Sequence, residues 1–170
     1  MIGRLLAMSC ALVLPLPLWP LPLWVDQPSV QVDPPNLQGS RPLEQQTETA
    51  LIHDYLESWQ SFRTALDRND PALLDQDFVG IARDKLADTI QEQLKLGIHT
   101  RYQDRAHHLQ IVFYSPEGLS IQMVDTVEYD QQVLEHDKVL TTRHMRARYL
   151  VVLTPTEVRW KVRIFQADAA

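Results

Sequence analysis

The hydrophobic and polar positions of this chain of 170 residues divide it into three parts. Residues 5–25 form an almost unbroken apolar run, and residues 26–46 are polar and rich in proline. From residue 47 onward, apolar and polar positions alternate as they do in a folded domain. The pattern predicts a leader over 1–25, a proline-rich linker over 26–46 and one domain over 47–168.

The domain is expected to begin with helices. Apolar residues recur with a period of 3.6 from Thr47, which predicts a helix that ends at Asn69-Asp70-Pro71. A single helical turn over 71–74 should follow, with Asp70 as its cap. A second long helix is expected over 77–96, stopped by Gly97. Its expected inward-facing residues are Phe78, Ile81, Ala82, Leu86, Ile90 and Leu94.

After Gly97 the period changes to two, which is typical of strands. Four strands are predicted, over 107–115, 119–134, 140–154 and 157–166. Helices that precede a run of antiparallel strands indicate an α+β fold, with the helices packed on one face of a four-stranded sheet. For the last hairpin we expect Leu153 to lie opposite Val158, which would place Arg148 opposite Arg163.

The apolar leader determines the expected compartment. Arg4 precedes the run, as in an export signal, while Pro15, Pro17, Pro20 and Pro22 disfavour a straight spanning helix. Both a signal peptide and an uncleaved membrane anchor fit this pattern. In either case the domain lies outside the cytoplasm, as a periplasmic or secreted protein or as a single-pass anchored one. Cys10 is the only cysteine, so no intramolecular disulfide forms, and its lipidation stays open.

The order of elements and two segments carry a family resemblance. The helix start LIHDYLESWQSFRTAL and the terminal hairpin RYLVVL…VRWKVRIFQ, with a curved antiparallel sheet between them, resemble the NTF2-like superfamily. Within it, the chain is similar to the membrane-tethered domains of the Tim44 and plastid-division kind and to the SnoaL-like group. The resemblance covers residues 47–166 and implies a cone-shaped domain with a pocket between helices and sheet.

Polar residues interrupt the apolar faces of two predicted strands. Asp125 and Arg143 share the parity of their apolar neighbours, so both should point inward, and they are natural partners for each other. Either they form a structural ion pair, or they line a polar pocket floor in which Asp125 accepts a proton or anchors a ligand. The predicted binding residues are Asp125, Arg143, Tyr149, Trp160 and Trp59.

Basic side chains alternate on the outer face of the last two predicted strands. This surface patch comprises Arg146, Arg148, Arg159, Lys161 and Arg163. Glu128 and Asp130 could pair with it within the sheet. The alternative is a docking patch for an anionic partner or a lipid headgroup.

Several kinds of chemistry lack a sequence motif. The six histidines are scattered, so no metal site is predicted, and no phosphate-binding or dinucleotide-binding motif indicates a cofactor. A net charge of −6 and the export signal both disfavour nucleic acid as a partner.

Two functions of different class remain. The first is a non-catalytic interaction module that binds a protein partner or a small apolar ligand. The second is a small enzyme of the SnoaL or ketosteroid-isomerase kind, in which Asp125 transfers protons in an apolar pocket. A cone filled by aromatic side chains favours the first, and a deep cavity favours the second. A homodimer through the sheet is a further expectation.

Overall fold

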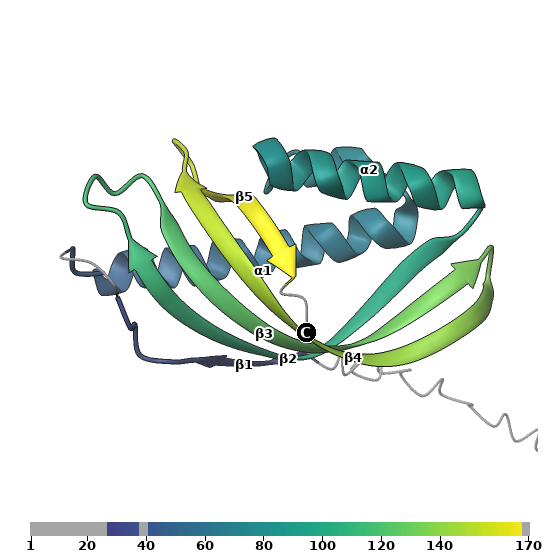
Figure 1. The fold of residues 1–170 in the computed structure, drawn as a ribbon, viewed down its shortest axis with the longest axis horizontal. Coiled ribbons are helices and arrows are strands. Elements are labelled where there is room, and N and C mark those ends of the chain that lie inside the picture. Colours follow the sequence, from purple (N-terminus) through teal and green to yellow (C-terminus); the bar gives the residue numbers. More distant parts are fainter. Residues whose placement is uncertain (1–26, 38–40, 168–170) are drawn as a thin grey trace, which may run out of the picture.

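The computed structural model describes residues 27–37 and 41–167 and shows an α+β domain (Figure 1). The predicted leader lies outside the described residues. Within the described ranges, no helix combines the length and the apolar character needed to cross a membrane. In chain order the elements are β1 (Ser29–Val32), α1 (Gln45–Arg68), the 3-10 helix η1 (Pro71–Leu74), α2 (Gly80–Leu96), β2 (His99–Tyr114), β3 (Ile121–Glu135), β4 (Lys138–Pro155) and β5 (Trp160–Ala167).

The first helix and the turn after it agree with the sequence pattern. Helix α1 ends at Asn69, whose left-handed conformation (φ 52°) turns the chain away from the helix axis. The side chain of Asp70 accepts a hydrogen bond from the amide of Ala72 at 3.0 Å and so caps η1. The apolar stripe of α1 is buried as expected, from Leu51 to Leu66.

Helix α2 starts three residues later than expected because the chain before it is extended. The amide of Val162 donates to the carbonyl of Asp77 at 2.8 Å, and the amide of Val79 donates to the carbonyl of Val162 at 2.9 Å. These bonds hold residues 77–79 beside β5. The inward stripe of α2 is narrower than expected: Ala82 and Ile90 are buried, whereas Ile81 and Leu94, which were expected inside, are 61% and 48% exposed.

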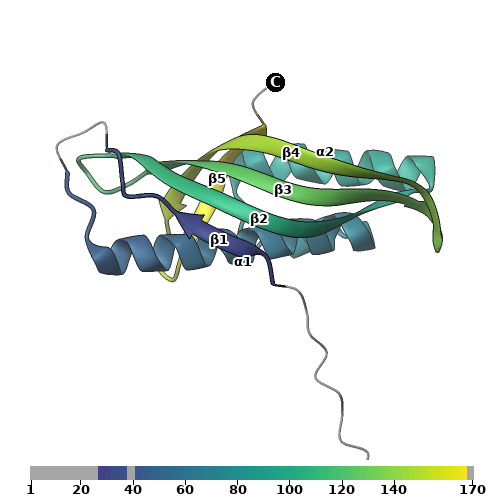
Figure 2. The same ribbon diagram turned by 90° about the horizontal axis from the view of Figure 1, so that it is seen from below.

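The sheet has one more strand than the sequence pattern predicts. Its order is β1-β2-β3-β4-β5, and β2 to β5 form the expected antiparallel meander (Figure 2). Strand β1 comes from the segment assigned to the linker and pairs in parallel with β2, from Ser29 opposite Ala106 to Val32 opposite Leu109. Val30 and Val32 have the β-branched side chains that favour strands, but four residues are too few to show a period in sequence.

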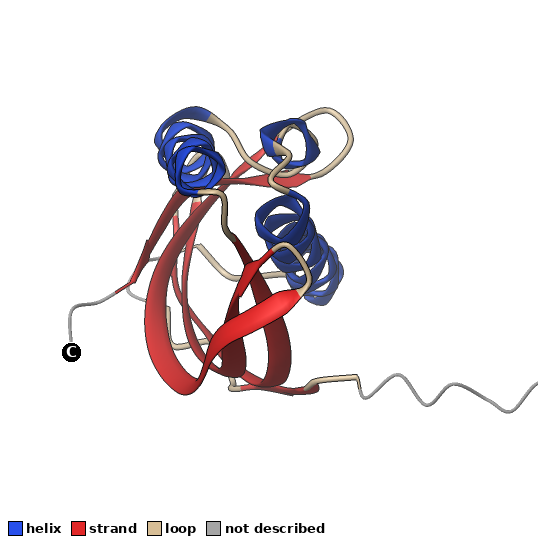
Figure 3. Ribbon diagram, turned by 90° about the vertical axis from the view of Figure 1, so that its right-hand side faces the viewer, coloured by secondary structure: helices blue, strands red, loops and turns tan. Residues whose placement is uncertain are grey.

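The sheet is strongly curved, and both long helices lie on its concave side (Figures 1 and 3). Helix α1 follows the concavity beside β2 and β5, while α2 lies toward the β5 side. Bulges interrupt β2 between Asp104 and Ala106 and again between Ile111 and Phe113. Bulges bend a strand and increase its twist, so they contribute to the curvature.

The register of the last hairpin differs from the expected one. Strand β5 begins at Trp160, which lies opposite Pro155, and Val162 lies opposite Leu153. The amide of Thr156 donates to the carbonyl of Arg159 at 2.9 Å, so these two residues close a turn that contains Val158. Val158 is therefore 88% exposed, and the expected pairing of Arg148 with Arg163 was wrong.

Candidate functional site

The carboxylate of Asp125 lies at the centre of β3 and is fully buried. The hydroxyl of Tyr55, from α1, donates a hydrogen bond to its Oδ2 atom at 2.7 Å. The Nδ1 atom of His107, from β2, contacts the same oxygen at 2.7 Å. The inward direction expected for Asp125 is thus what the structure has, and its partners come from a helix and a neighbouring strand.

Arg143 is not the partner of Asp125. The residue opposite Asp125 on β4 is Tyr149, whereas Arg143 lies opposite Gln131, six positions away along the strand. Arg143 is exposed. Strand alternation correctly gave the face of the sheet on which Arg143 lies, but it gives no information on how far apart two residues lie along that face.

The bulge in β2 brings a second carboxylate into the interior. Because of the extra residue between Asp104 and Ala106, even-numbered positions face inward before the bulge and odd-numbered positions after it. Asp104 and His107 therefore both point inside, and Asp104 Oδ2 lies 3.8 Å from His107 Nε2. Arg63 of α1 reaches the same carboxylate, with Nη1 at 2.8 Å from Oδ2. We call Tyr55, Arg63, Asp104, His107 and Asp125 the buried cluster.

The buried cluster holds His107 as a cation. Burial alone lowers the pKa of His107, but the hydrogen bonds and negative charges of Asp104 and Asp125 outweigh it and raise the pKa to about 9. For Tyr55, burial and the adjacent Asp125 raise the pKa well above its usual value, so the phenol stays protonated and acts as a donor. Both donors thus stabilise the buried carboxylate, and the raised pKa of His107 favours the imidazolium over the neutral imidazole near neutral pH.

Aromatic side chains fill the concave face next to the buried cluster. The ring of Trp59 is 2% exposed and makes edge contacts with His107 at 5.1 Å and with Tyr149 at 5.4 Å between ring centres. Phe165 stacks on Tyr149 at 4.7 Å. Trp160 is only half-buried at the start of β5, and its amide donates to Asp54 at 2.8 Å. Trp59 and Tyr149 therefore lie together, while Trp160 and Arg143 lie elsewhere.

A side pocket of about 380 Å³ opens between α1, β2 and the chain that leads into β1. His107, Asp104, Arg63 and Trp59 form its inner wall. Within the described residues, three buried polar atoms on this wall have no hydrogen-bond partner: Trp59 Nε1, Arg63 Nε and Asp104 Oδ1.

The predicted surface patch is divided between two regions. Arg146 pairs with Glu128 at 3.6 Å, as expected within the sheet, and Arg148 and Arg163 are exposed. Arg159, however, bonds to Asp77, and Lys161 donates to the carbonyl of Asp75 at 3.1 Å. These two side chains hold β5 against the chain between η1 and α2. Because β5 starts later than expected, Arg159 and Lys161 do not join the other basic side chains on the outer face of the sheet.

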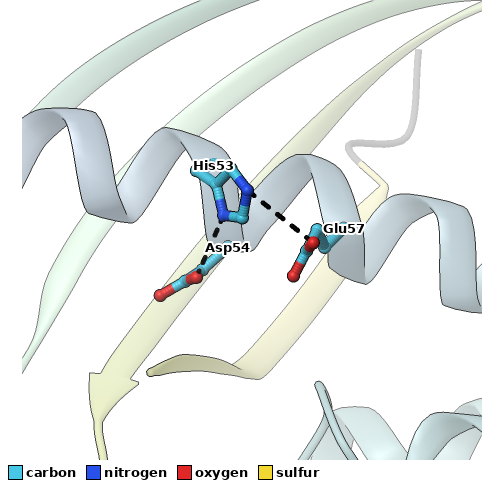
Figure 4. Close-up of side chains that lie close together, drawn as sticks. All are labelled: His53, Asp54 and Glu57. Carbon is cyan, nitrogen blue, oxygen red and sulfur yellow. Dashed lines mark hydrogen bonds and ion pairs between the residues drawn. The ribbon is translucent and has the colours of Figure 1, made fainter. Parts of the chain in front are cut away.

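One group of possible metal ligands stands apart from the buried cluster. His53, Asp54 and Glu57 project together from α1, with ligand atoms within 4.8 Å of one another (Figure 4). Sequence analysis overlooked this grouping, although His53 and Glu57 are one helical turn apart. Asp54 already accepts the Trp160 amide, and Glu57 lies 3.4 Å from Arg159. The two carboxylates thus already have protein partners.

Comparison with known proteins supports the fold. No protein-family model matches the chain, and no curated protein matches it. Among solved structures, the intermembrane space region of the chloroplast protein ARC6 superposes with a TM-score of 0.60 at 14% identity, covering 76% of this chain and 100% of that one.

Two further similar structures are those of enzymes by their descriptions. A putative scytalone dehydratase from Novosphingobium aromaticivorans superposes with a TM-score of 0.50 at 13% identity, over 74% of this chain and 89% of that one. A putative dehydratase of the NTF2-like family from Streptomyces avermitilis gives 0.50 at 12% identity, over 72% and 98%.

The domain therefore has an NTF2-like fold, as the sequence resemblance implied. The structures that share it include both a region of a chloroplast protein and two described as putative dehydratases, so fold similarity alone does not select a function. Of the buried cluster, sequence analysis named only Asp125 and missed Tyr55, Arg63, Asp104 and His107. For His107 a signal was available: it lies two residues before the inward-facing Leu109, so strand alternation places both side chains on the same inner face.

Proposed function

We propose that this chain is a non-catalytic interaction module that binds a protein partner outside the cytoplasm. The observation that carries this proposal is the state of the concave face. Trp59, Tyr149 and Phe165 pack against one another where a substrate would lie. His107 is held between two carboxylates that raise its pKa to about 9, which disfavours it as a general base near neutral pH.

The partner is proposed to be a protein because β4 exposes both charged side chains, at Arg143 and Arg146, and apolar ones, at Val139 and Leu140. The similar ARC6 structure is of an intermembrane space region, which is consistent with a domain of this fold working beyond a membrane. The apolar residues 5–25 would provide the export signal or the anchor, and both remain open.

Site-specific photo-cross-linking of the full chain in its own cells tests the proposal. A photoreactive residue is placed at one exposed position at a time, for example Thr142 on β4 or Gln91 on α2. We expect a cross-link to one defined protein from one face of the domain, lost on competition with the unmodified chain. The absence of any saturable cross-link from positions spread over the domain would overturn the proposal.

The cellular location has its own test. Protease added to intact cells or to their outer compartment should degrade the domain, and sequencing the mature N-terminus should show whether residues 1–25 are retained. Protection of the domain until the cytoplasm is opened would contradict an extracytoplasmic location.

A second function, a small enzyme, is favoured by one observation. The side pocket borders His107 and Asp104, and three of its lining residues, Trp59, Arg63 and Asp104, each carry a buried polar atom without a hydrogen-bond partner. In this alternative, a small apolar molecule would bind there and shift the NMR resonances of the His107 ring. If the chain is a non-catalytic module, no apolar compound should shift those resonances in the wild-type protein. A compound that shifts them in the wild-type protein but not in Asp104→Asn would favour the enzyme.

A further inference from the structure

His53, Asp54 and Glu57 of α1 form a cluster that offers one nitrogen ligand and two carboxylates. The imidazole ring lies between the two carboxylates, with Nδ1 of His53 3.4 Å from Asp54 Oδ1 and Nε2 3.7 Å from Glu57 Oε1 (Figure 4). Ligand atoms of all three side chains lie within 4.8 Å of one another. We call these three residues the α1 cluster.

Each carboxylate of the α1 cluster is held by one oxygen from outside the cluster. The amide of Trp160 donates to Asp54 Oδ2 at 2.8 Å, and Arg159 Nη1 lies 3.4 Å from Glu57 Oε2. The other oxygen of each carboxylate faces His53. Carboxylates that bind metal ions are oriented in this way, by donors that do not touch the ion themselves.

The local charge also favours a cation. Arg159 contacts both Glu57 and Asp77, so two carboxylates share one guanidinium. Among the described residues, the ion pair of Asp54 is with His53 alone. When the imidazole is neutral, these three carboxylates and the one guanidinium leave an excess of two negative charges, which one divalent cation would balance.

The spacing of the ligand atoms suits a small transition-metal ion. Tetrahedral Zn²⁺ with bonds of about 2.1 Å places two ligand atoms about 3.4 Å apart. Both distances from the His53 ring are close to this value, whereas the widest separation in the cluster, up to 4.8 Å, has to shorten. The His53 side chain is 66% exposed, so its ring can rotate to bring one nitrogen toward both carboxylates without disturbing the core.

We propose that the α1 cluster binds a divalent transition-metal ion of the Zn²⁺ class, with one ligand atom from each of its three residues. Imidazole nitrogen suits Zn²⁺ and Ni²⁺, whereas Mg²⁺ and Ca²⁺ prefer oxygen ligands alone. Three protein ligands leave a coordination position for water or for a donor atom of another molecule. This inference goes beyond the proposed interaction function and does not depend on it.

An ion in this site would connect α1 to the start of β5. Asp54 and Glu57 contact Trp160 and Arg159, which follow directly on the turn between β4 and β5. Coordination of Asp54 Oδ1 withdraws charge from the carboxylate that accepts the Trp160 amide. The resonance of that amide therefore reports on Asp54 as a ligand, although Trp160 itself does not bind the ion.

Zn²⁺ binding to the full chain, without a histidine tag, tests the site by calorimetry and NMR. All proteins compared have the substitution Cys10→Ser, because Cys10 is the only thiol and would compete for the ion. We expect a saturable site whose occupation shifts the resonances of the His53 ring and the Trp160 amide together. EDTA should reverse both shifts, and Mg²⁺ should produce neither.

Substitution of the ligands supplies the matched comparison. His53→Gln and Glu57→Gln should each weaken Zn²⁺ binding by about tenfold or more. His144→Gln is the control, because His144 is also exposed, at 59%, and contacts a carboxylate, that of Asp130, at 3.0 Å. This control should alter binding by less than about twofold. Because the His53 side chain is mostly exposed, His53→Gln is expected to keep the fold, which circular dichroism checks.

Three outcomes would overturn the metal site. Failure of the wild-type sequence to bind Zn²⁺ saturably would mean that the α1 cluster forms ion pairs only. Equal weakening by His53→Gln and His144→Gln would mean that Zn²⁺ binds exposed histidines without selection. A shift of the His53 ring without a shift of the Trp160 amide would exclude Asp54 as a ligand. None of these outcomes bears on the photo-cross-linking test of the interaction module.

Discussion

Two stretches of β4 differ in how deeply they bury the side chains that point to the concave face of the sheet. Tyr149 is 8% exposed and packs among Trp59 and Phe165, whereas Arg143, on the same face, is exposed. The difference lies in which other elements pack against each stretch. Strand β5 and helix α1 enclose the first stretch, whereas the described part of β5 reaches no further along β4 than Tyr149. Strand alternation therefore assigns a face, but burial depends on what the rest of the chain places over it.

The enclosed stretch should be far more sensitive to substitution than the open one. Asp125→Asn leaves the His107 cation buried without its closest partner, so we expect a loss of about 3–5 kcal/mol in the free energy of unfolding. Arg143→Gln should change it by less than about 0.5 kcal/mol. Urea unfolding of both variants measures the contrast, and similar values for the two would contradict it.

The pH dependence of stability should also originate in the enclosed stretch. The folded pKa of His107, about 9, lies above its ordinary 6.5, so its stabilisation is complete below about pH 6.5 and is lost as the pH rises through 9. We expect the free energy of unfolding to fall by roughly 3 kcal/mol over that range. The variant His107→Gln should flatten this dependence. Parallel pH profiles for the two proteins would show that His107 is not the titrating group.

A smaller loss is expected from Tyr55→Phe, which removes one donor from the buried carboxylate of Asp125. A hydrogen bond to a charged group contributes about 2 kcal/mol. Tyr114→Phe is the matched control, since the ring of Tyr114 contacts the Arg41 guanidinium through its face. Thermal and urea unfolding should separate the two variants, and an equal effect would argue against a specific role for the Tyr55 hydroxyl.

The smallest effect on stability is expected on the outer face of β4. Arg146 is 70% exposed in its pair with Glu128, so Arg146→Ala should change the free energy of unfolding by less than about 0.5 kcal/mol. A stability loss above 1 kcal/mol would instead make Arg146 part of the framework of the sheet.

Much of the fold could be predicted from the sequence because its periods are clear. The apolar stripe of α1, the cap at Asp70 and the alternation in β3 each extend over enough residues to identify the element. Strand β1 could not be found in this way, because an alternation of apolar and polar residues cannot be recognised over only four residues. The register of the last hairpin was wrong because its turn, from Thr156 to Arg159, carries no strong turn signature.

The site was harder to predict than the fold. The inward direction of Asp125 followed from alternation, and filling of the concave face by aromatic side chains such as Trp59 and Tyr149 was one of the two outcomes left open. Asp104 could not be assigned to the interior, because a bulge changes the parity of β2 at that point and bulges have no reliable sequence signal. His107 was on the inward face by alternation but was passed over because no metal or catalytic motif includes it.

Strand β1 also limits how far the domain can stand from a membrane. If the apolar run that ends at Val25 stays in a bilayer, only three residues separate it from Ser29, and they span about 10 Å when extended. The whole segment 26–46 would have spanned about 70 Å. The domain would then be held at the headgroup surface with restricted orientation, and a partner would have to approach within that narrow height.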